Sequence, residues 1–252
     1  MTRSVWTLSR LASSIAVAVA LMAGGCGGVS KQQHDAVAAA RIRAAQARAI
    51  AQQARLGPDV QEFLAKAAAA SSVTYTVVYD QGNGQTTSVF ARAPDRRIDV
   101  VGASGAGSTD RVIIRGSDTV VCHLNADRWA CVSGVESAPG GPFTPDAITQ
   151  TIGSLVQLSQ TYDFTVSQRR MLGLDASCLA AARRAAAAAD PTVGDHALIC
   201  VAPSGVILRV EDSGNPVQAT SYRESVPSGA FQLPARPTPA VTSTSTSPAP
   251  QP

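Results

Sequence analysis

The sequence predicts an α+β fold in which one antiparallel β-sheet carries one or two helices on one face. From Val73 to Tyr79, apolar and polar residues alternate, which is typical of a half-buried strand. Similar segments follow at short spacings, and their neighbours must be antiparallel because parallel pairing needs long crossover connections. The other expected strands are 86–91, 98–101, 111–115, 119–124, 129–132, 162–167, 171–179, 197–201, 206–210 and 217–223.

Two segments between these strands have helical periodicity. Pro58 suits the first turn of a helix, and the segment that follows it carries apolar residues on one side. Pro145 opens a second such segment at 146–159. By helical spacing, the inward residues of the two helices are Val60, Phe63, Leu64, Ile148, Ile152 and Leu155.

Residues 26–57 are expected to form a helical or flexible tether. The stretch 31–56 is rich in Ala, Gln and Arg, so it has helical propensity but few large apolar groups to bury. Arg41, Arg48 and Arg55 recur every seven residues and fall on one helical face. This face is either solvated or a basic stripe that lies against anionic lipid headgroups.

The N-terminus has the plan of a secretory signal peptide, which we assign to residues 1–25. Arg3 and Arg10 precede an uncharged, mostly apolar run that is too short to span a membrane. Small residues then lead to Cys26, and this arrangement resembles the bacterial lipobox, in which that cysteine is acylated. The alternative is an ordinary cleaved signal peptide with an incidental cysteine.

The charge of the chain argues against nucleic acid as a partner. The formal net charge is +3, and removal of residues 1–25 takes away two positive charges and no acid. Nucleic-acid binding needs a dense basic footprint, which such a near-neutral chain lacks.

Four cysteines follow Cys26, and an even number in an exported protein indicates disulfides with three possible connectivities. Cys122 and Cys131 flank the turn-forming residues 125–128, so a hairpin places them directly opposite each other. Cys178 then pairs with Cys200. The alternative, a four-thiolate zinc site, usually shows close Cys-x-x-Cys pairs, which this sequence lacks.

The sequence predicts neither an enzyme nor a cofactor or metal site. The segment 102–106 departs from a nucleophile elbow at its fifth position, which is Ala106. His34, His123 and His196 stand at unrelated spacings and form no metal-binding helical face.

The chain resembles the LolA/LolB-like bacterial envelope lipoproteins, including actinobacterial lipoproteins with the half-barrel fold. The resemblance spans about 58–234 and rests on Cys26 after a signal peptide, the helix leading into Val73–Tyr79, and the segments 90–97, 200–208 and 230–234. It implies one strongly curved antiparallel sheet, with helices on its concave face enclosing an apolar cavity for acyl chains. The six inward helical residues named above would line that cavity. Residues 235–252, rich in Pro, Thr and Ser, form a disordered tail.

We therefore expect a non-catalytic lipoprotein, anchored on the extracytoplasmic face of the cell membrane, that binds or carries lipid or another hydrophobic ligand. The alternative is a structural or interaction lipoprotein with a filled core, which binds another envelope protein. An open apolar cavity favours the first function, and an exposed apolar patch on a solid domain favours the second.

Cys26→Ser should release the protein from membranes and leave its domain folded, because the rest of the N-terminal region offers no other anchor. Membrane fractionation of cells that express the variant measures this. Retention of the variant in the membrane fraction would contradict the anchor assignment.

Overall fold

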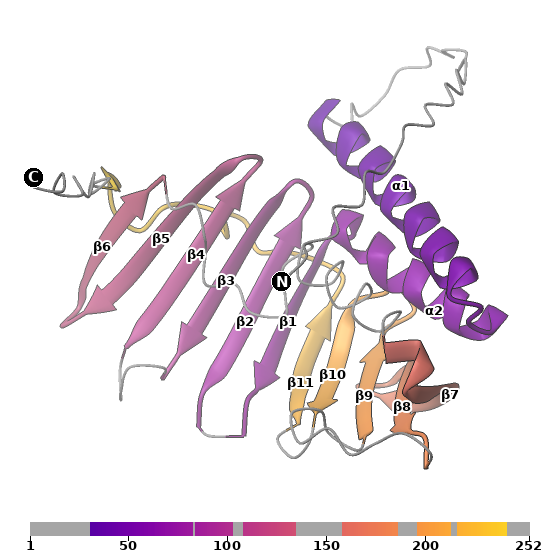
Figure 1. Ribbon diagram of the computed structural model, residues 1–252. Helices are drawn as coiled ribbons and strands as arrows, with labels where there is room; N and C mark the ends of the chain where they lie inside the picture. The colour runs from indigo at the N-terminus through magenta and orange to yellow at the C-terminus, as the bar shows by residue number, and fades with distance from the viewer. Residues whose placement is uncertain are drawn as a thin grey trace, which may run out of the picture.

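The computed structural model describes residues 31–82, 84–102, 108–134, 158–185, 196–212 and 216–240, and its elements are shown in Figure 1. Two α-helices, α1 (Lys31–Gln53) and α2 (Pro58–Ala69), precede the sheet, and the short 3-10 turns Ala70–Ser72 and Leu158–Gln160 lead into strands. The strands are β1 (Tyr75–Asp80), β2 (Thr86–Arg92), β3 (Asp95–Val101), β4 (Thr109–Arg115), β5 (Asp118–Asn125), β6 (Arg128–Ser133), β7 (Tyr162–Met171), β8 (Leu174–Arg183), β9 (His196–Val201), β10 (Ile207–Asp212), β11 (Val217–Arg223) and β12 (Thr238–Pro239).

All strands belong to one twelve-stranded sheet with the order β12-β6-β5-β4-β3-β2-β1-β11-β10-β9-β8-β7. Each meander pairs neighbours in sequence, and β1 pairs with β11 to join the two meanders. The expectation of a purely antiparallel sheet is wrong at one place, because β12 runs parallel to β6. Parallel pairing needs a long connection between the two strands. The C-terminal segment provides one, because it returns along the sheet before it reaches β6.

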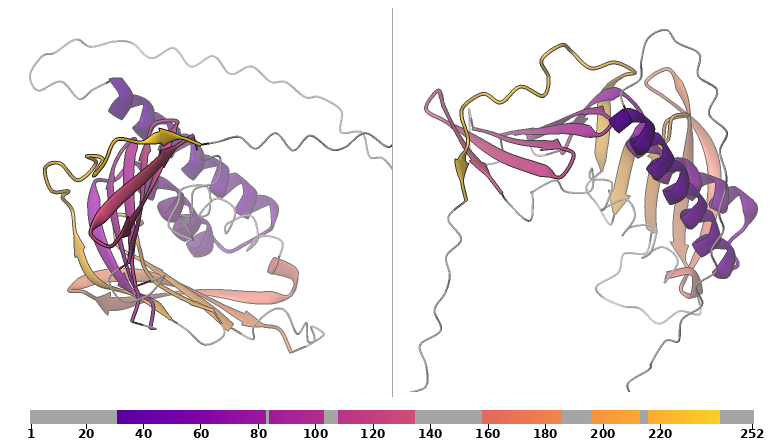
Figure 2. Two further views of the ribbon diagram at one scale, coloured as in Figure 1. Left: turned by 90° about the vertical axis from the view of Figure 1, so that its left-hand side faces the viewer. Right: turned by 90° about the horizontal axis from the view of Figure 1, so that it is seen from above.

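The sheet is open and strongly curved, and both helices lie inside its bend (Figure 2, left). Helix α2 packs on the β7–β10 half, where its apolar residues meet Leu179, Val201 and their neighbours. Helix α1 packs on α2. No helix in the described part of the chain has the length and apolar character needed to cross a membrane.

Helix α1 is part of the folded domain and not only a tether. Its contact side is made of alanines, and Ala40, Ala47 and Ala51 are buried. Small side chains let α1 approach α2 closely without a large apolar stripe. Arg41 and Arg48 of the predicted basic stripe are exposed, and Arg48 makes an ion pair with Glu62 of α2 at 2.6 Å. Arg55 lies beyond the end of α1 with φ 57°, so the prediction that it shares one helical face with the other two is wrong.

Several predicted features lie outside the described residues. These are the signal peptide 1–25, Cys26, most of the helix predicted at 146–159 with Ile148, Ile152 and Leu155, and the end of the tail from 241 onward. The tail prediction began at 235, but residues up to Ala240 contact the sheet. The contact of residues 235–240 with the sheet was not predicted, because an extended Pro-rich segment shows neither helical nor alternating periodicity.

Both predicted cysteine pairs are bonded in the structure. Cys122 lies directly opposite Cys131 in the β5–β6 hairpin, and Cys178 lies opposite Cys200 between β8 and β9. All four residues are buried. Each bridge therefore links two adjacent strands across one rung of the sheet.

Gly205 marks the closest approach between the sheet and α2. It lies in the turn between β9 and β10 with φ +85°, and a Cβ there would lie 2.1 Å from the carbonyl oxygen of Lys66. Only glycine leaves room for the turn to touch the end of the helix.

Gly205→Ala should therefore destabilise the domain strongly. A left-handed backbone costs about 1–2 kcal/mol for alanine, and overpacking typically adds about 1–3 kcal/mol. Gly116→Ala is the matched control, because Gly116 also has positive φ but open space around it. Urea unfolding should show a clearly larger loss for Gly205→Ala, and equal losses would contradict the close contact.

Replacing Cys178 and Cys200 together by Ala should destabilise the domain more than replacing Cys122 and Cys131. The bridges close separations of 22 and 9 residues, and loop-closure entropy makes the longer one worth roughly 0.8 kcal/mol more, on a base of about 2–4 kcal/mol. Urea unfolding measures both pairs. Peptide mapping that linked Cys131 to Cys178 would refute the pairing itself.

Candidate ligand-binding site

The C-terminal strap, residues 224–240, crosses the face of the sheet opposite the helices (Figure 2, left). Thr76 Oγ1 donates to the carbonyl of Ser225 at 2.7 Å at the start of the strap. Ala240 N donates to the carbonyl of Ser133 at 2.9 Å at its end, beside the β12–β6 pairing. Between these points Ala230 and Phe231 are buried. The strap is therefore held at both ends and in its middle.

A layer of arginines on this face holds the middle of the strap. Arg97 Nη1 donates to the carbonyl of Ala230 at 2.9 Å, and Arg115 donates to the carbonyl of Phe231. The guanidinium of Arg92 lies 5.1 Å from the centre of the Phe231 ring, within the range of a cation–π contact. Side chains of the sheet thus replace the backbone partners that the strap lacks.

Asp99 sets the positions of two of these arginines. Its carboxylate accepts hydrogen bonds from Arg97 Nε and Arg111 Nε, each at 2.8 Å. Burial by itself raises the pKa of Asp99, but the hydrogen bonds from Arg97 and Arg111 outweigh it and hold the pKa below its usual value. The contribution of Asp99 to stability is therefore present above its unfolded-state pKa and is lost as pH falls through the folded-state value.

The two arginines also lie over aromatic rings. Arg97 stands 4.7 Å from the centre of Phe90, and Arg111 stands 4.6 Å from the centre of Trp129. Trp129 and Phe90 thus support the arginines that lie beneath the strap.

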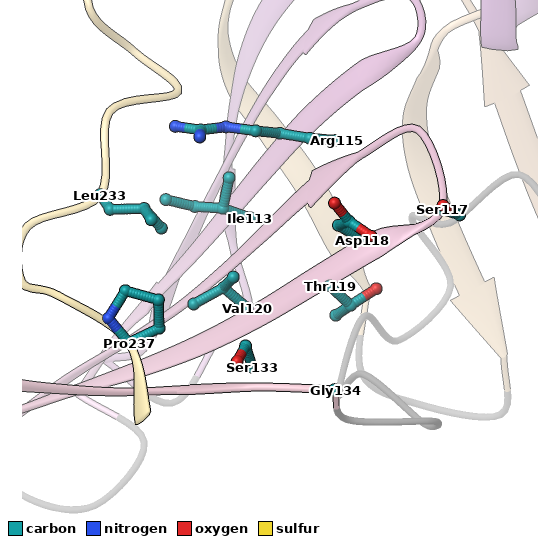
Figure 3. A pocket seen from close by; sticks show the side chains of 10 residues that line it. All are labelled: Ile113, Arg115, Ser117, Asp118, Thr119, Val120, Ser133, Gly134, Leu233 and Pro237. Carbon is teal, nitrogen blue, oxygen red and sulfur yellow. The ribbon is translucent and has the colours of Figure 1, made fainter. Parts of the chain in front are cut away.

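A groove of about 630 Å³ opens between the strap and strands β4, β5 and β6 (Figure 3). Register places Ile113, Val120 and Ser133 in one row across these strands, on the same face as Arg97. Leu233 and Pro237 of the strap form the opposite wall. The rim carries the polar residues Arg115, Ser117, Asp118 and Thr119. Apolar walls with polar groups at one side suit an amphiphilic ligand, and the volume is within the usual range of ligand sites.

The predicted cavity lining on α2 has a different environment. Val60, Phe63 and Leu64 do come together, but they are 6%, 3% and 1% exposed and pack against the β7–β10 half of the sheet. Val60 also borders a pocket of about 620 Å³ and Phe63 one of about 370 Å³, and β7 contributes to the lining of both. The other half of the predicted lining lies outside the described residues.

The groove residues on the opposite face were not predicted from the sequence. The sequence does carry one signal, in Val112-Ile113-Ile114 and in Val120-Val121. Apolar residues there occupy consecutive positions, so they point to both faces of the sheet. Such runs indicate strands covered on both faces. The partner of the second face could not be inferred, because the strap lies more than a hundred residues further along the chain.

Chemistry-bearing groups elsewhere are sparse in the described part of the chain. His123 Nδ1 lies 2.5 Å from Asp110 Oδ1 across β4 and β5, and the described residues offer no hydroxyl or thiol hydrogen-bonded to this histidine. Within the same residues, no group of three or more His, Cys, Asp or Glu side chains could hold a metal ion.

No family model and no curated protein matches the sequence. Among solved structures, the chain is similar to an outer membrane lipoprotein-sorting protein domain from Vibrio parahaemolyticus, with 9% identity and a TM-score of 0.25. The alignment covers 75% of this chain and 97% of that one. A TM-score of 0.25 is too low to support an argument about fold or function.

Proposed function

We propose that this chain is a non-catalytic lipoprotein, exported and anchored at the extracytoplasmic face of the cell membrane through Cys26, which binds a hydrophobic ligand in the groove beneath the C-terminal strap. The observation that carries the ligand-binding part is the groove of about 630 Å³ with its apolar walls. The lipobox-like sequence that ends at Cys26 supports the anchor.

The ligand class follows from the lining. Val120, Leu233 and Pro237 offer apolar surface of a size that suits an alkyl or acyl chain. Arg115 on the rim is exposed, and its position beside Asp118 in the β4–β5 hairpin provides charges of both signs. An amphiphile that lies with its chain in the groove and its polar group at this rim meets both requirements.

A second candidate function is that of an interaction lipoprotein that binds another envelope protein. The burial of Val60, Phe63 and Leu64 in the contact between α2 and the sheet favours it, because a well-packed core leaves the surface of the domain as the means of recognition. The two functions differ in whether the groove beneath the strap holds a small hydrophobic molecule.

Val120→Trp should abolish ligand binding and leave the fold intact, because Val120 is half-buried in the groove and the indole would occupy its space. The full-length chain is titrated with the fluorescent fatty acid cis-parinaric acid, and the affinity should fall at least about tenfold, equivalent to about 1.4 kcal/mol. Val101→Trp is the matched control, because Val101 is an exposed valine on the same face that does not line the groove.

Thermal melting should give similar transitions for both tryptophan variants and the parent. If the two tryptophan variants bound cis-parinaric acid equally well, the proposal that the ligand lies in the groove would be wrong. No binding by the parent, with no lipid found by native mass spectrometry of the purified chain, would leave the interaction lipoprotein as the better function.

A further inference from the structure

Among the described residues, strand β7 forms one end of the sheet and pairs with β8 alone. It pairs with β8 from Tyr162 to Met171, the full length of the strand. At the other end of the sheet, β12 pairs with part of β6 and covers that part of its edge. A long strand with one unpaired edge is a template for another strand.

The turn between β7 and β8 determines which backbone groups point outward. Leu172 and Gly173 both have positive φ, 50° and 79°, as a two-residue type I′ hairpin requires. The flanking residues Met171 and Leu174 then exchange their hydrogen bonds with each other. Pairing alternates along the strand, so the peptide groups that face away from β8 include those of Phe164, Val166 and Gln168.

Two pockets lie between β7 and α2. Near the start of the strand, a pocket of about 620 Å³ is lined by the α1–α2 connection and by residues of β7 that include Phe164. Near its end, a pocket of about 370 Å³ is lined by Phe63, Lys66, Val166 and Gln168. An added strand would hydrogen-bond to β7 and direct alternate side chains into these pockets, as in other β-augmentation sites.

We propose that the occupant is β7 of a second copy of this chain, paired antiparallel about a two-fold axis in the register that places Val166 opposite itself. This register matches the outward-facing peptide groups of both strands. It places Phe164 opposite the partner's Gln168, so that the ring meets the smaller pocket. The two sheets become one continuous sheet with the helices of both copies on the same face.

Charge complementarity selects this register. It places Asp163 opposite the partner's Arg169, twice in the dimer because of the symmetry. Both residues are exposed, and no described residue makes an ion pair or hydrogen bond with Arg169. Asp163 accepts a hydrogen bond from Arg184 at 2.8 Å, which leaves its second oxygen for the partner. A shift of the centre to residue 165 or 167 places Arg169 opposite an uncharged residue.

Disulfide trapping tests the register in the full-length chain. In Val166→Cys the two new thiols face each other across the axis, on the face away from the Cys178–Cys200 bridge. Mild oxidation of the purified chain should give a band of twice the mass on a non-reducing gel. Ile42→Cys is the control, because Ile42 is 58% exposed on α1 and should trap little dimer by collision.

A charge swap tests the ion pairs independently. When added to Val166→Cys, Arg169→Asp should lower the trapped dimer several-fold, because it places two acids opposite each other. Adding Asp163→Arg to that variant should restore trapping. Arg128→Asp makes the same charge change at the other end of the sheet and should have no effect.

A second cysteine variant tests the same register in case Val166→Cys does not fold. Phe164→Cys and Gln168→Cys in one chain also lie opposite each other in this register, so they should give dimer as well. Failure of both variants to exceed Ile42→Cys would overturn the proposal. A trapped band that contained a different protein would also overturn it, by assigning the edge to a foreign strand.

Discussion

The pairing of β1 with β11 holds the domain together, because it joins two meanders that would otherwise be separate sheets. The joint contains a bulge between Val78 and Tyr79, at the centre of the curved sheet. Tyr79 is buried there, and its hydroxyl donates to the carbonyl of Ile207 on β10 at 2.7 Å. Burial raises the pKa of Tyr79 well above its usual value, so the phenol remains a neutral donor.

This joint also determines what covers each face. With β1 beside β11, α2 packs on the β7–β10 half on one side, and the strap that follows β11 returns across the other side. The inner face is closed by apolar packing, whereas the outer face is closed by arginines that hold a peptide segment. The two faces therefore offer different surfaces: one has the pockets between α2 and β7, and the other has the amphiphilic groove beneath the strap.

The local elements were largely predictable from the sequence, because alternation and turn residues are local signals. Strands such as Val217–Arg223 and the Cys122–Cys131 rung follow directly from them. The turn at Leu172-Gly173 was missed, because it lies inside an otherwise strand-like run. The packing of helix α1 was not predicted, because its buried side chains are small alanines and not the large apolar residues that indicate a buried helical face. The groove was beyond local reasoning, since its two walls come from distant segments.

The strap has a consequence for the order in which the domain can form. A chain that emerges from its N-terminus first presents β1 to β6 long before β11 and residues 224–240 arrive. Until then β1 has an unpaired edge, and Arg97 and Arg115 have no peptide carbonyls to bind. Such long-range contacts delay folding, because the entropy cost of closing a long loop comes before the free energy gained from the contacts. The domain can therefore complete its structure only after nearly the whole polypeptide has been delivered to the compartment where it folds.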